Sequence, residues 1–161
     1  ASGGKTILMF DTMQNIRMHV SDVRESILFN ADKRLQEAGI RPASVQVIDL
    51  TEPFDIKKPF DFVFADLPCS GSGTWGRTPE QIAFFKKENL ETYTLLQSKI
   101  IANILPTVKL NGHLLLATCS VYAAENEAHV QAILSQGQFE LVEQKYFQHQ
   151  QPILDHFQLL L

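Results

Sequence analysis

Short apolar runs alternate with amphipathic helical segments along this chain, and this alternation is the feature that most limits its fold. Residues 61–66 (DFVFAD) and 113–119 (HLLLATC) are nearly continuous apolar runs, typical of parallel strands that are buried on both faces. Between them, residues 79–105 carry apolar side chains at helical spacing, in one or two pieces, until Pro106 ends the helix. Strands that alternate with helices predict an open α/β sheet with helices on both faces.

The remaining segments extend the same pattern. Three further helices are expected, at residues 5–15, 24–39 and 125–137. Four further strands are expected, at residues 16–22, 44–50, 139–147 and 156–161. The last two of these are expected to close the sheet as an antiparallel pair. The predicted sheet is therefore mostly parallel, with an antiparallel strand at its C-terminal end.

The composition limits the class of protein. The chain has 161 residues, 45% of them hydrophobic and 20% charged, which is ordinary for one globular domain with a full core. No apolar run approaches the ~20 residues of a membrane span, and the five histidines show no metal-ligand spacing. Two cysteines do not indicate a disulfide scaffold, so we expect a reducing, cytoplasmic setting. We expect neither a membrane nor a metal as a partner.

The net charge also bears on the partner. It is −4, whereas a protein that binds nucleic acid through many phosphates is usually basic on at least one face. Either nucleic acid is not the partner, or a separate segment supplies the basic surface.

Acidic residues follow three of the expected strands. Asp22, Asp49 and Asp66 each stand at or near a strand end, and ligands of open α/β sheets bind at the carboxyl ends of the strands. Asp22 follows a Gly-Gly loop and fits the position that binds ribose hydroxyls, and Asp49 fits one that faces an adenine edge. Taken alone, each is more often a plain strand end or helix cap.

The segment GGKT, residues 3–6, allows three interpretations. It matches the end of a phosphate-binding P-loop, in which Lys5 would bind phosphate. Gly3 and Gly4 would equally let the backbone approach the amino-acid part of a cofactor, or form a plain turn.

Cys69 and Cys119 are the only cysteines, and each comes just after an expected strand and directly before a serine. A thiolate is a strong nucleophile, although an isolated cysteine is more often core filler. Two thiols at the ligand edge of a parallel sheet favour chemistry, and neighbouring strands would let them meet. His113 is expected at the opposite end of its strand from Cys119, which does not suit a Cys–His hydrolase. A helical His129 is usually structural or solvated.

Four motifs occur in an order that resembles one known family. DLPCSGSG (66–73) resembles D-A-P-C-S-G-S-G, and TCSVYAAENE (118–127) resembles T-C-S followed by P-x-E-N-E. ASGGKT (1–6) is similar to A-P-G-G-K-T, and SDVRESIL (21–28) resembles a ribose-binding strand end. Together they resemble the catalytic domain of the S-adenosylmethionine-dependent RNA cytosine-5 methyltransferases, the Nop/Sun (RsmB-type) family. The resemblance runs from Ala1 to about Gln136.

The resemblance implies a Rossmann-like class I methyltransferase sheet and a division of catalytic roles. Cys119 would attack carbon 6 of a cytosine, which makes carbon 5 nucleophilic enough to accept a methyl group. Asp66 would bind the N3 and amino edge of the base, and Cys69 would assist release of the product.

The resemblance also implies binding residues and partners. The cofactor would be S-adenosylmethionine, bound by Gly3, Gly4, Lys5, Asp22, Arg24, Asp49, Asp66 and Pro68. The other partner would be RNA, more often ribosomal than transfer RNA in this family. Trp75 would stack on a base and Arg77 would contact phosphate, although Trp75 is equally suited to be a hydrophobic plug under its loop.

The resemblance implies one catalytic domain over residues 1–161, truncated at its N-terminus, with the first strand and the RNA-binding region absent. We therefore expect weak or no activity from this segment alone. Three other functions remain open: an amino-methyltransferase acting on nucleic acid or protein, a P-loop nucleotide-binding module, and an inactive relative that serves as an assembly factor.

Overall fold

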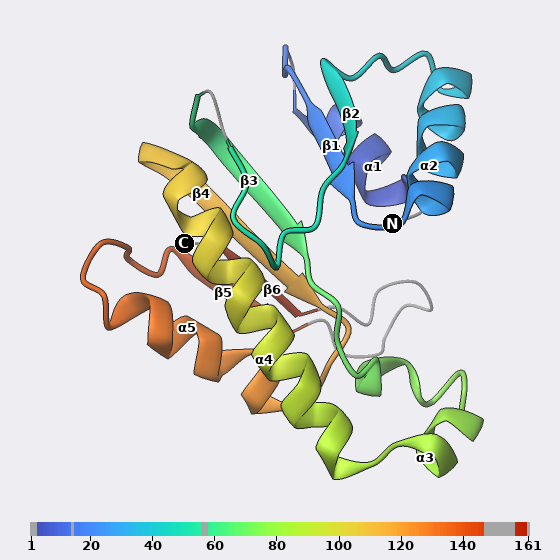
Figure 1. The fold of residues 1–161 in the computed structure, drawn as a ribbon, viewed down its shortest axis with the longest axis vertical. Helices are drawn as coiled ribbons and strands as arrows, with labels where there is room; N and C mark the ends of the chain where they lie inside the picture. The colour runs from blue at the N-terminus through green and yellow to red at the C-terminus, as the bar shows by residue number, and fades with distance from the viewer. Residues whose placement is uncertain (1–2, 14, 56–57, 147–156, 161) are drawn as a thin grey trace. The chain divides into compact units, whose positions relative to one another are not determined.

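The computed structural model describes residues 3–13, 15–55, 58–146 and 157–160 (Figure 1). The chain divides into two compact units, Ala1–Leu50 and Thr51–Leu161, and each is described by itself. In both units helices lie between strands, which confirms the predicted mixed α/β class. Among the described residues no helix is long and apolar enough to cross a membrane.

The first unit holds two helices and two parallel strands. Its elements are α1 (Gly4–Thr12), β1 (His19–Asp22), α2 (Glu25–Glu37) and β2 (Ser44–Val47). The strands pair in register from His19 opposite Ser44 to Asp22 opposite Val47. The helix between them buries Leu28, Ala31 and Leu35, and this spacing is the helical periodicity seen in the sequence.

Both ends of this strand pair differ from the expected bounds. β1 begins at His19 rather than at residue 16, and β2 ends at Val47 rather than at residue 50. Asp49 therefore lies beyond its strand and not at the strand end. Gly39 closes α2 in the left-handed conformation, with a φ of 74° that glycine adopts without steric cost.

The second unit is built on a four-stranded sheet. Its strands are β3 (Phe60–Asp66), β4 (Val108–Thr118), β5 (Glu143–Tyr146) and β6 (Phe157–Leu160), in the spatial order β3-β4-β6-β5. β3 and β4 are parallel, whereas β6 pairs antiparallel with both β4 and β5. The predicted parallel pair and the predicted antiparallel closing pair are both confirmed. Residues 147, 156 and 161, which the closing prediction also covers, lie outside the described residues.

β4 begins at Val108, five residues earlier than the sequence pattern predicts. Its pairing with β3 is interrupted by a register shift between Phe60 and Phe62. Gly112 lies at this irregularity, where an added Cβ would approach the Lys109 carbonyl oxygen to 2.9 Å. Backbone crowds this position, so only glycine fits without a shift of the strands.

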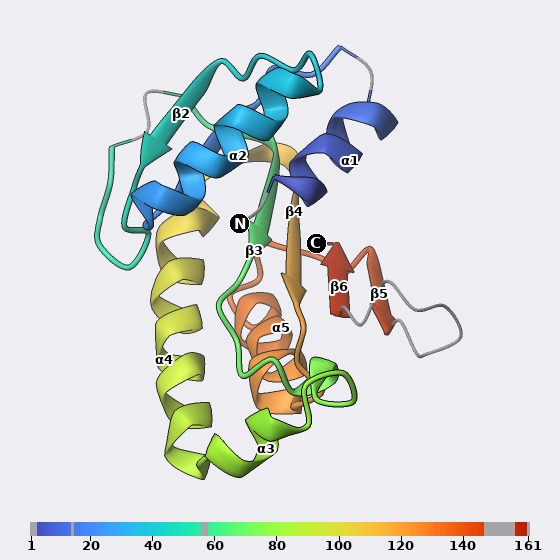
Figure 2. The same cartoon turned by 90° about the vertical axis from the view of Figure 1, so that its right-hand side faces the viewer.

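The helices of the second unit form one layer against its sheet. They are α3 (Glu80–Phe84), α4 (Lys87–Ile104) and α5 (Glu127–Leu134), with 3₁₀ turns at Ser72–Thr74, Leu105–Thr107 and Ala123–Glu125. α4 and α5 run side by side and cover one face of β3 and β4 (Figures 1 and 2). The helix predicted over residues 79–105, in one or two pieces, is present as the two pieces α3 and α4. The buried apolar residues of these helices and of β4 include Ile100, Ile101, Ile104, Leu114, Leu116, Val130 and Ile133.

Candidate functional site: two thiols and a shared carboxylate

The parallel pair β3 and β4 delivers both cysteines to the same edge of the sheet. Asp66 lies opposite Ala117, and the Leu67 amide continues the ladder with a hydrogen bond of 2.9 Å to the Ala117 carbonyl oxygen. Beyond this point the Sγ atoms of Cys69 and Cys119 are 3.2 Å apart. The Cys119 backbone N–H also donates to Cys69 Sγ at 3.3 Å. The prediction that the two thiols meet across neighbouring strands is confirmed.

The two thiols are not equivalent. The hydrogen bond to the Cys119 sulfur, burial, and the charge of Cys119 together raise the pKa of the Cys69 thiol far above its ordinary value. Cys69 therefore holds its proton more firmly than an ordinary thiol does, and either sulfur can donate in the S···S contact.

A buried carboxylate explains why a serine follows each cysteine. The Glu125 side chain accepts the Ser70 backbone N–H at 2.8 Å on Oε1 and the Ser70 hydroxyl at 2.5 Å on Oε2. The Ser120 hydroxyl donates to the same Oε2. Glu125 is only 1% exposed, so these hydrogen bonds replace the water that it would otherwise bind. One carboxylate thus holds both loops that carry the cysteines.

Two residues on the covering helices complete this network. Gln97 of α4 donates from Nε2 to the Pro68 carbonyl oxygen at 2.7 Å and to Glu125 Oε1 at 3.3 Å. His129 of α5 lies 2.7 Å from Gln97 Oε1 through its Nε2. Burial lowers the pKa of His129, and the opposing charge of Glu125 does not offset this. A neutral His129 therefore donates its Nε2 proton to the Gln97 carbonyl oxygen.

Asn126 fixes the backbone that leads out of β4. Its Oδ1 accepts the Thr118 hydroxyl at 2.5 Å, and its Nδ2 donates to the carbonyl oxygens of Ser120 at 2.9 Å and Tyr122 at 3.0 Å. Asn126 is 2% exposed, so its amide is satisfied within the protein. The loop that carries Cys119 is therefore held at both ends by one short motif, Glu125-Asn126.

The glycine-rich loop after Cys69 packs directly on Cys119. The Gly73 N–H donates to the Cys119 carbonyl oxygen at 2.9 Å, and the Val121 N–H donates to Ser72 Oγ at 2.9 Å. A Cβ on Gly73 would lie 3.1 Å from that same carbonyl oxygen. The loop therefore needs glycine here for close approach of the two backbones.

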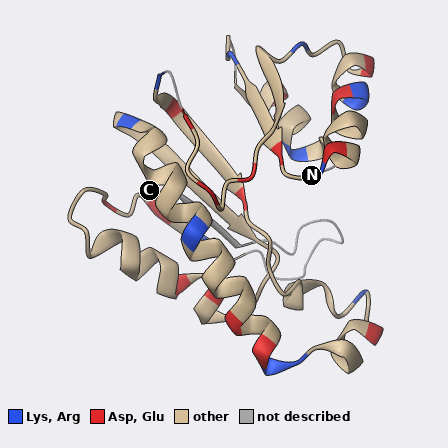
Figure 3. Cartoon of the chain, viewed as in Figure 1, with Lys and Arg blue, Asp and Glu red and all other residues tan. Residues whose placement is uncertain are grey.

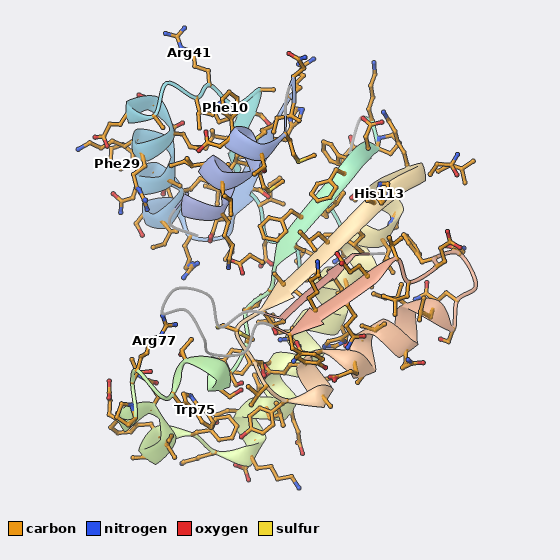
Figure 4. The ribbon with its side chains drawn as sticks, turned by 180° about the vertical axis from the view of Figure 1, so that it is seen from behind. Phe10, Phe29, Arg41, Trp75, Arg77 and His113 are labelled. Atoms are coloured by element: carbon orange, nitrogen blue, oxygen red, sulfur yellow. The ribbon has the colours of Figure 1, made fainter. Side chains whose placement is uncertain are left out.

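Aromatic residues form a cluster beside this loop. The centroid of the Trp75 ring lies 4.9 Å from that of Phe85 and 6.1 Å from that of Tyr122. The Phe85 and Tyr122 rings are stacked, with their centroids 5.7 Å apart. These are contacts that a hydrophobic plug makes. Figure 4 shows Trp75 directed toward neighbouring rings and Arg77 directed away from them.

The first unit carries most of the predicted cofactor residues. Asp22 is the last residue of β1, and its two carboxylate oxygens accept hydrogen bonds from Arg24 Nε at 3.1 Å and Nη2 at 3.2 Å. Burial raises the pKa of Asp22, but the hydrogen bonds and charge of Arg24 outweigh it and hold the pKa below its usual value. The Arg24 backbone N–H also donates to Oδ1 at 2.9 Å, so Arg24 orients an ionised carboxylate and leaves one lone pair, on Oδ2, for the ribose.

The glycine turn also suits a cofactor. Gly3 precedes α1 as its N-cap with a φ of 80°, a left-handed conformation that glycine adopts without steric cost. Such a helix start favours negative charge, for instance a carboxylate. Asp49 is exposed beyond β2. Asp66, an exposed residue, and Pro68 lie in the second unit, on the chain leading to Cys69.

Sequence reasoning missed the residues that hold the thiols in place. Glu125, Gln97 and His129 were not predicted, although the serine after each cysteine was a usable signal. His113 was placed wrongly, since it lies in the middle of β4 opposite Phe62 rather than at a strand end. The described residues contain no group of three or more His, Cys, Asp or Glu that could hold a metal ion.

The fold and the paired thiols define the class of protein. The sheet is that of Rossmann-like methyltransferases, and similar solved structures include NSun6 from Pyrococcus horikoshii with SFG, at a TM-score of 0.81. That structure is 21% identical, and the match covers 99% of this chain and 45% of that one. The N-methyltransferase NodS from Bradyrhizobium japonicum with S-adenosyl-l-homocysteine matches at a TM-score of 0.61 and 15% identity, over 99% of this chain and 72% of that one.

The family follows from the sequence comparisons. Residues 1–158 match the family of the 16S rRNA methyltransferase RsmB/F, and the chain belongs to this family. It is 30% identical over 146 residues to ribosomal RNA small subunit methyltransferase B of Yersinia enterocolitica, covering 89% of this chain and 34% of that protein. It is 31% identical to the Escherichia coli O127:H6 protein of the same name, covering 83% of this chain and 32% of that protein. The chain thus spans about a third of these relatives.

Proposed function

We propose that this protein transfers a methyl group from S-adenosylmethionine to carbon 5 of a cytosine in RNA, through a covalent bond between Cys119 and carbon 6 of the base. The observation that carries the proposal is the 3.2 Å contact between the Sγ atoms of Cys69 and Cys119 beyond the ends of β3 and β4. Transfer to an exocyclic nitrogen needs no thiol, so such a pair would have no role in it.

The two sulfurs suit opposite halves of one covalent cycle. The Cys119 thiolate adds to carbon 6, and the electron pair of the carbon 5–carbon 6 double bond moves toward carbon 5 and the ring. Carbon 5 then takes the methyl group and loses its proton to solvent. The electrons of that C–H bond re-form the double bond, and the bond between Cys119 and carbon 6 breaks. Cys69 donates a hydrogen bond to the departing sulfur and so stabilises the regenerated thiolate.

The residues of the first unit suit the cofactor. The ionised Asp22 binds the ribose hydroxyls, Asp49 lies on the adenine side, and the backbone at Gly3, Gly4 and Lys5 holds the methionine end. When bound, S-adenosylmethionine supplies an electrophilic methyl group. Arg24 keeps the Asp22 carboxylate oriented and ionised.

The RNA substrate is proposed to be small-subunit ribosomal RNA, because the similar proteins of Yersinia enterocolitica and Escherichia coli are ribosomal RNA small subunit methyltransferases. Asp66 hydrogen-bonds the N3 and amino edge of the target cytosine, and the base must be unstacked to reach Cys119. Arg77 contacts phosphate, and the half-buried Trp75 ring stacks on a base in this proposal. Figure 3 shows acidic and basic positions interspersed along the ribbon.

Trapping on a modified RNA tests the proposal. Fluorine at carbon 5 cannot leave as a proton does, so an RNA transcript containing 5-fluorocytidine should hold the enzyme as a covalent adduct. Purified protein, S-adenosylmethionine and this transcript are mixed, and the intact mass of the protein is measured. The adduct is expected to persist with Cys69→Ser and to vanish with Cys119→Ser. Methylation without any adduct would favour an amino-methyltransferase instead.

A further inference from the structure

The Glu125 side chain connects the loop that follows Cys69 with the loop that follows Cys119. Four donors converge on its carboxylate: the Ser70 N–H and Gln97 Nε2 on Oε1, and the hydroxyls of Ser70 and Ser120 on Oε2. An ionised carboxylate has about four lone-pair sites, so this one is fully used within the protein. Glu125 has no further capacity to act on a substrate.

The direction of these contacts matters for the position of the sulfurs. Ser70 is the next residue after Cys69, and Ser120 is the next residue after Cys119. Each cysteine is therefore joined by one peptide bond to a serine that the Glu125 carboxylate holds in place. The direct contact between the two serines, 3.3 Å from Ser70 Oγ to Ser120 Oγ, is longer than the 2.5 Å hydrogen bond from Ser70 to Glu125. It joins two neutral groups and is therefore weaker than a hydrogen bond to a carboxylate.

We propose that Glu125 is a positioning residue that sets the separation of the Cys69 and Cys119 sulfurs by holding Ser70 and Ser120 on one carboxylate. The inference rests on the proposed function only in the roles that it gives the two thiols. Glu125 touches neither sulfur in the described contacts and acts through the serines. Both attack by Cys119 and release assisted by Cys69 depend on the spacing that it sets.

The first test uses neither RNA nor cofactor. The purified protein is equilibrated with mixtures of reduced and oxidised glutathione, and the fraction with a Cys69–Cys119 disulfide is measured by mass spectrometry. This equilibrium gives the effective concentration of one thiol at the other. Glu125→Gln removes the charge and replaces one acceptor oxygen by an NH2 donor, so the effective concentration of one thiol at the other is expected to fall roughly tenfold or more, as for loss of a charge-assisted hydrogen bond.

Matched variants separate positioning from general stability. Glu127→Gln makes the same chemical change two residues further on, at the start of α5, and is expected to leave the equilibrium unchanged. Ser70→Ala and Ser120→Ala keep the carboxylate and are each expected to lower the effective concentration, even if Glu125→Gln fails to fold. Adding Ser120→Ala to Glu125→Gln is expected to change little, because that contact is already weakened. Unchanged equilibria in Glu125→Gln and in both serine variants would overturn the inference.

A second measurement links the spacing to turnover. On RNA, Glu125→Gln is expected to lower kcat with little change in KM, because the carboxylate positions reacting groups and does not bind substrate. A wild-type protein that does not methylate RNA would sink the proposed function, and the glutathione result would still stand. A wild type that methylates, with Glu125→Gln equal to it in kcat and in thiol equilibrium, would refute the positioning role alone.

Discussion

At the scale of single residues, two identical side chains lie in different surroundings. The Sγ atoms of Cys69 and Cys119 are 3.2 Å apart, and the pKa of the Cys69 thiol is raised by the hydrogen bond to Cys119, by burial and by the charge beside it. In the proposed mechanism, substitution of either cysteine alone therefore has different consequences. Loss of Cys119 removes the proposed nucleophile, whereas loss of Cys69 affects only the proposed release step.

This asymmetry predicts a trapped intermediate. Cys69→Ala is expected to form the covalent complex on ordinary, unfluorinated small-subunit rRNA and to release it slowly. Removal of one catalytic proton donor typically costs about 10²–10⁴-fold in rate, so the complex should accumulate while product formation falls by that order. Denaturing gels and intact mass measure the complex. Turnover at the wild-type rate in Cys69→Ala would contradict the role assigned to Cys69, and the Cys69→Ala/Cys119→Ala double variant serves as the control without adduct.

Close backbone approach predicts a second residue-scale effect. Gly73→Ala places a Cβ 3.1 Å from the Cys119 carbonyl oxygen, and this neighbour is backbone that cannot easily move. The expected loss in the free energy of unfolding is about 1–3 kcal/mol, as for overpacked sites, with a lower midpoint in chemical denaturation. Gly76→Ala is the matched control, because a Cβ there would meet nothing within 4 Å. Equal midpoints for the two variants would show that the loop relaxes freely.

At the scale of helices and strands, prediction succeeded where the pattern is local. β3 was predicted almost to the residue because its run of apolar side chains is continuous. β4 was predicted too short, because its first five residues, VKLNG, include Lys109, Asn111 and Gly112 and so break the apolar run. These residues pair with β3 only through the irregular part of the ladder. A local sequence pattern carries no information about a partner strand that lies far away in the sequence, so the extra pairing could not be predicted from it.

The candidate site divides in the same way. Both cysteines were predicted because strand ends and thiol chemistry are visible in short motifs. Glu125 was not, because its partner Ser70 lies 55 residues away and Gln97 lies 28 residues away. His129 was given its ordinary structural reading, but its contact with Gln97 across α4 and α5 follows only from the packing of the two helices.

The contact between α4 and α5 predicts a pH dependence of stability. The pKa of His129 is lower in the folded protein than in the unfolded chain, because burial disfavours the charged ring and the charge of Glu125 only partly compensates. The unfolded state then binds more protons at low pH. The contribution of His129 to the free energy of unfolding is present above about pH 6.5 and is lost as the pH falls toward the lower folded pKa.

Thermal melting checks this expectation. Between about pH 7.5 and pH 5.5, a window that brackets the unfolded His pKa, the wild-type midpoint is expected to fall more than that of His129→Gln. The Gln side chain can donate to Gln97 but cannot take up a proton. His19→Gln is the control, since His19 is exposed on β1. Parallel curves for wild type and His129→Gln would show that His129 does not titrate in this window.

At the scale of the whole molecule, a ligand that binds only the folded state stabilises it by mass action. The free energy gained is RT ln(1 + [L]/Kd), about 2.7 kcal/mol at a hundredfold excess over Kd. S-adenosylhomocysteine keeps the ribose and amino-acid parts of the proposed cofactor and lacks the methyl group. It is therefore expected to raise the melting midpoint of the protein without any RNA present.

The dependence of this rise on Asp22 identifies where the ligand binds. Asp22→Asn removes the charged acceptor that Arg24 holds at the end of β1, and loss of such a hydrogen bond weakens binding by roughly tenfold or more. Asp61→Asn is the matched control, because Asp61 is exposed and pairs with Lys109 at 2.6 Å on the second unit. At a fixed ligand concentration the rise should shrink in Asp22→Asn and stay complete in Asp61→Asn. A complete rise in Asp22→Asn would mean that the ribose is bound elsewhere, even if the protein still proves to be a methyltransferase.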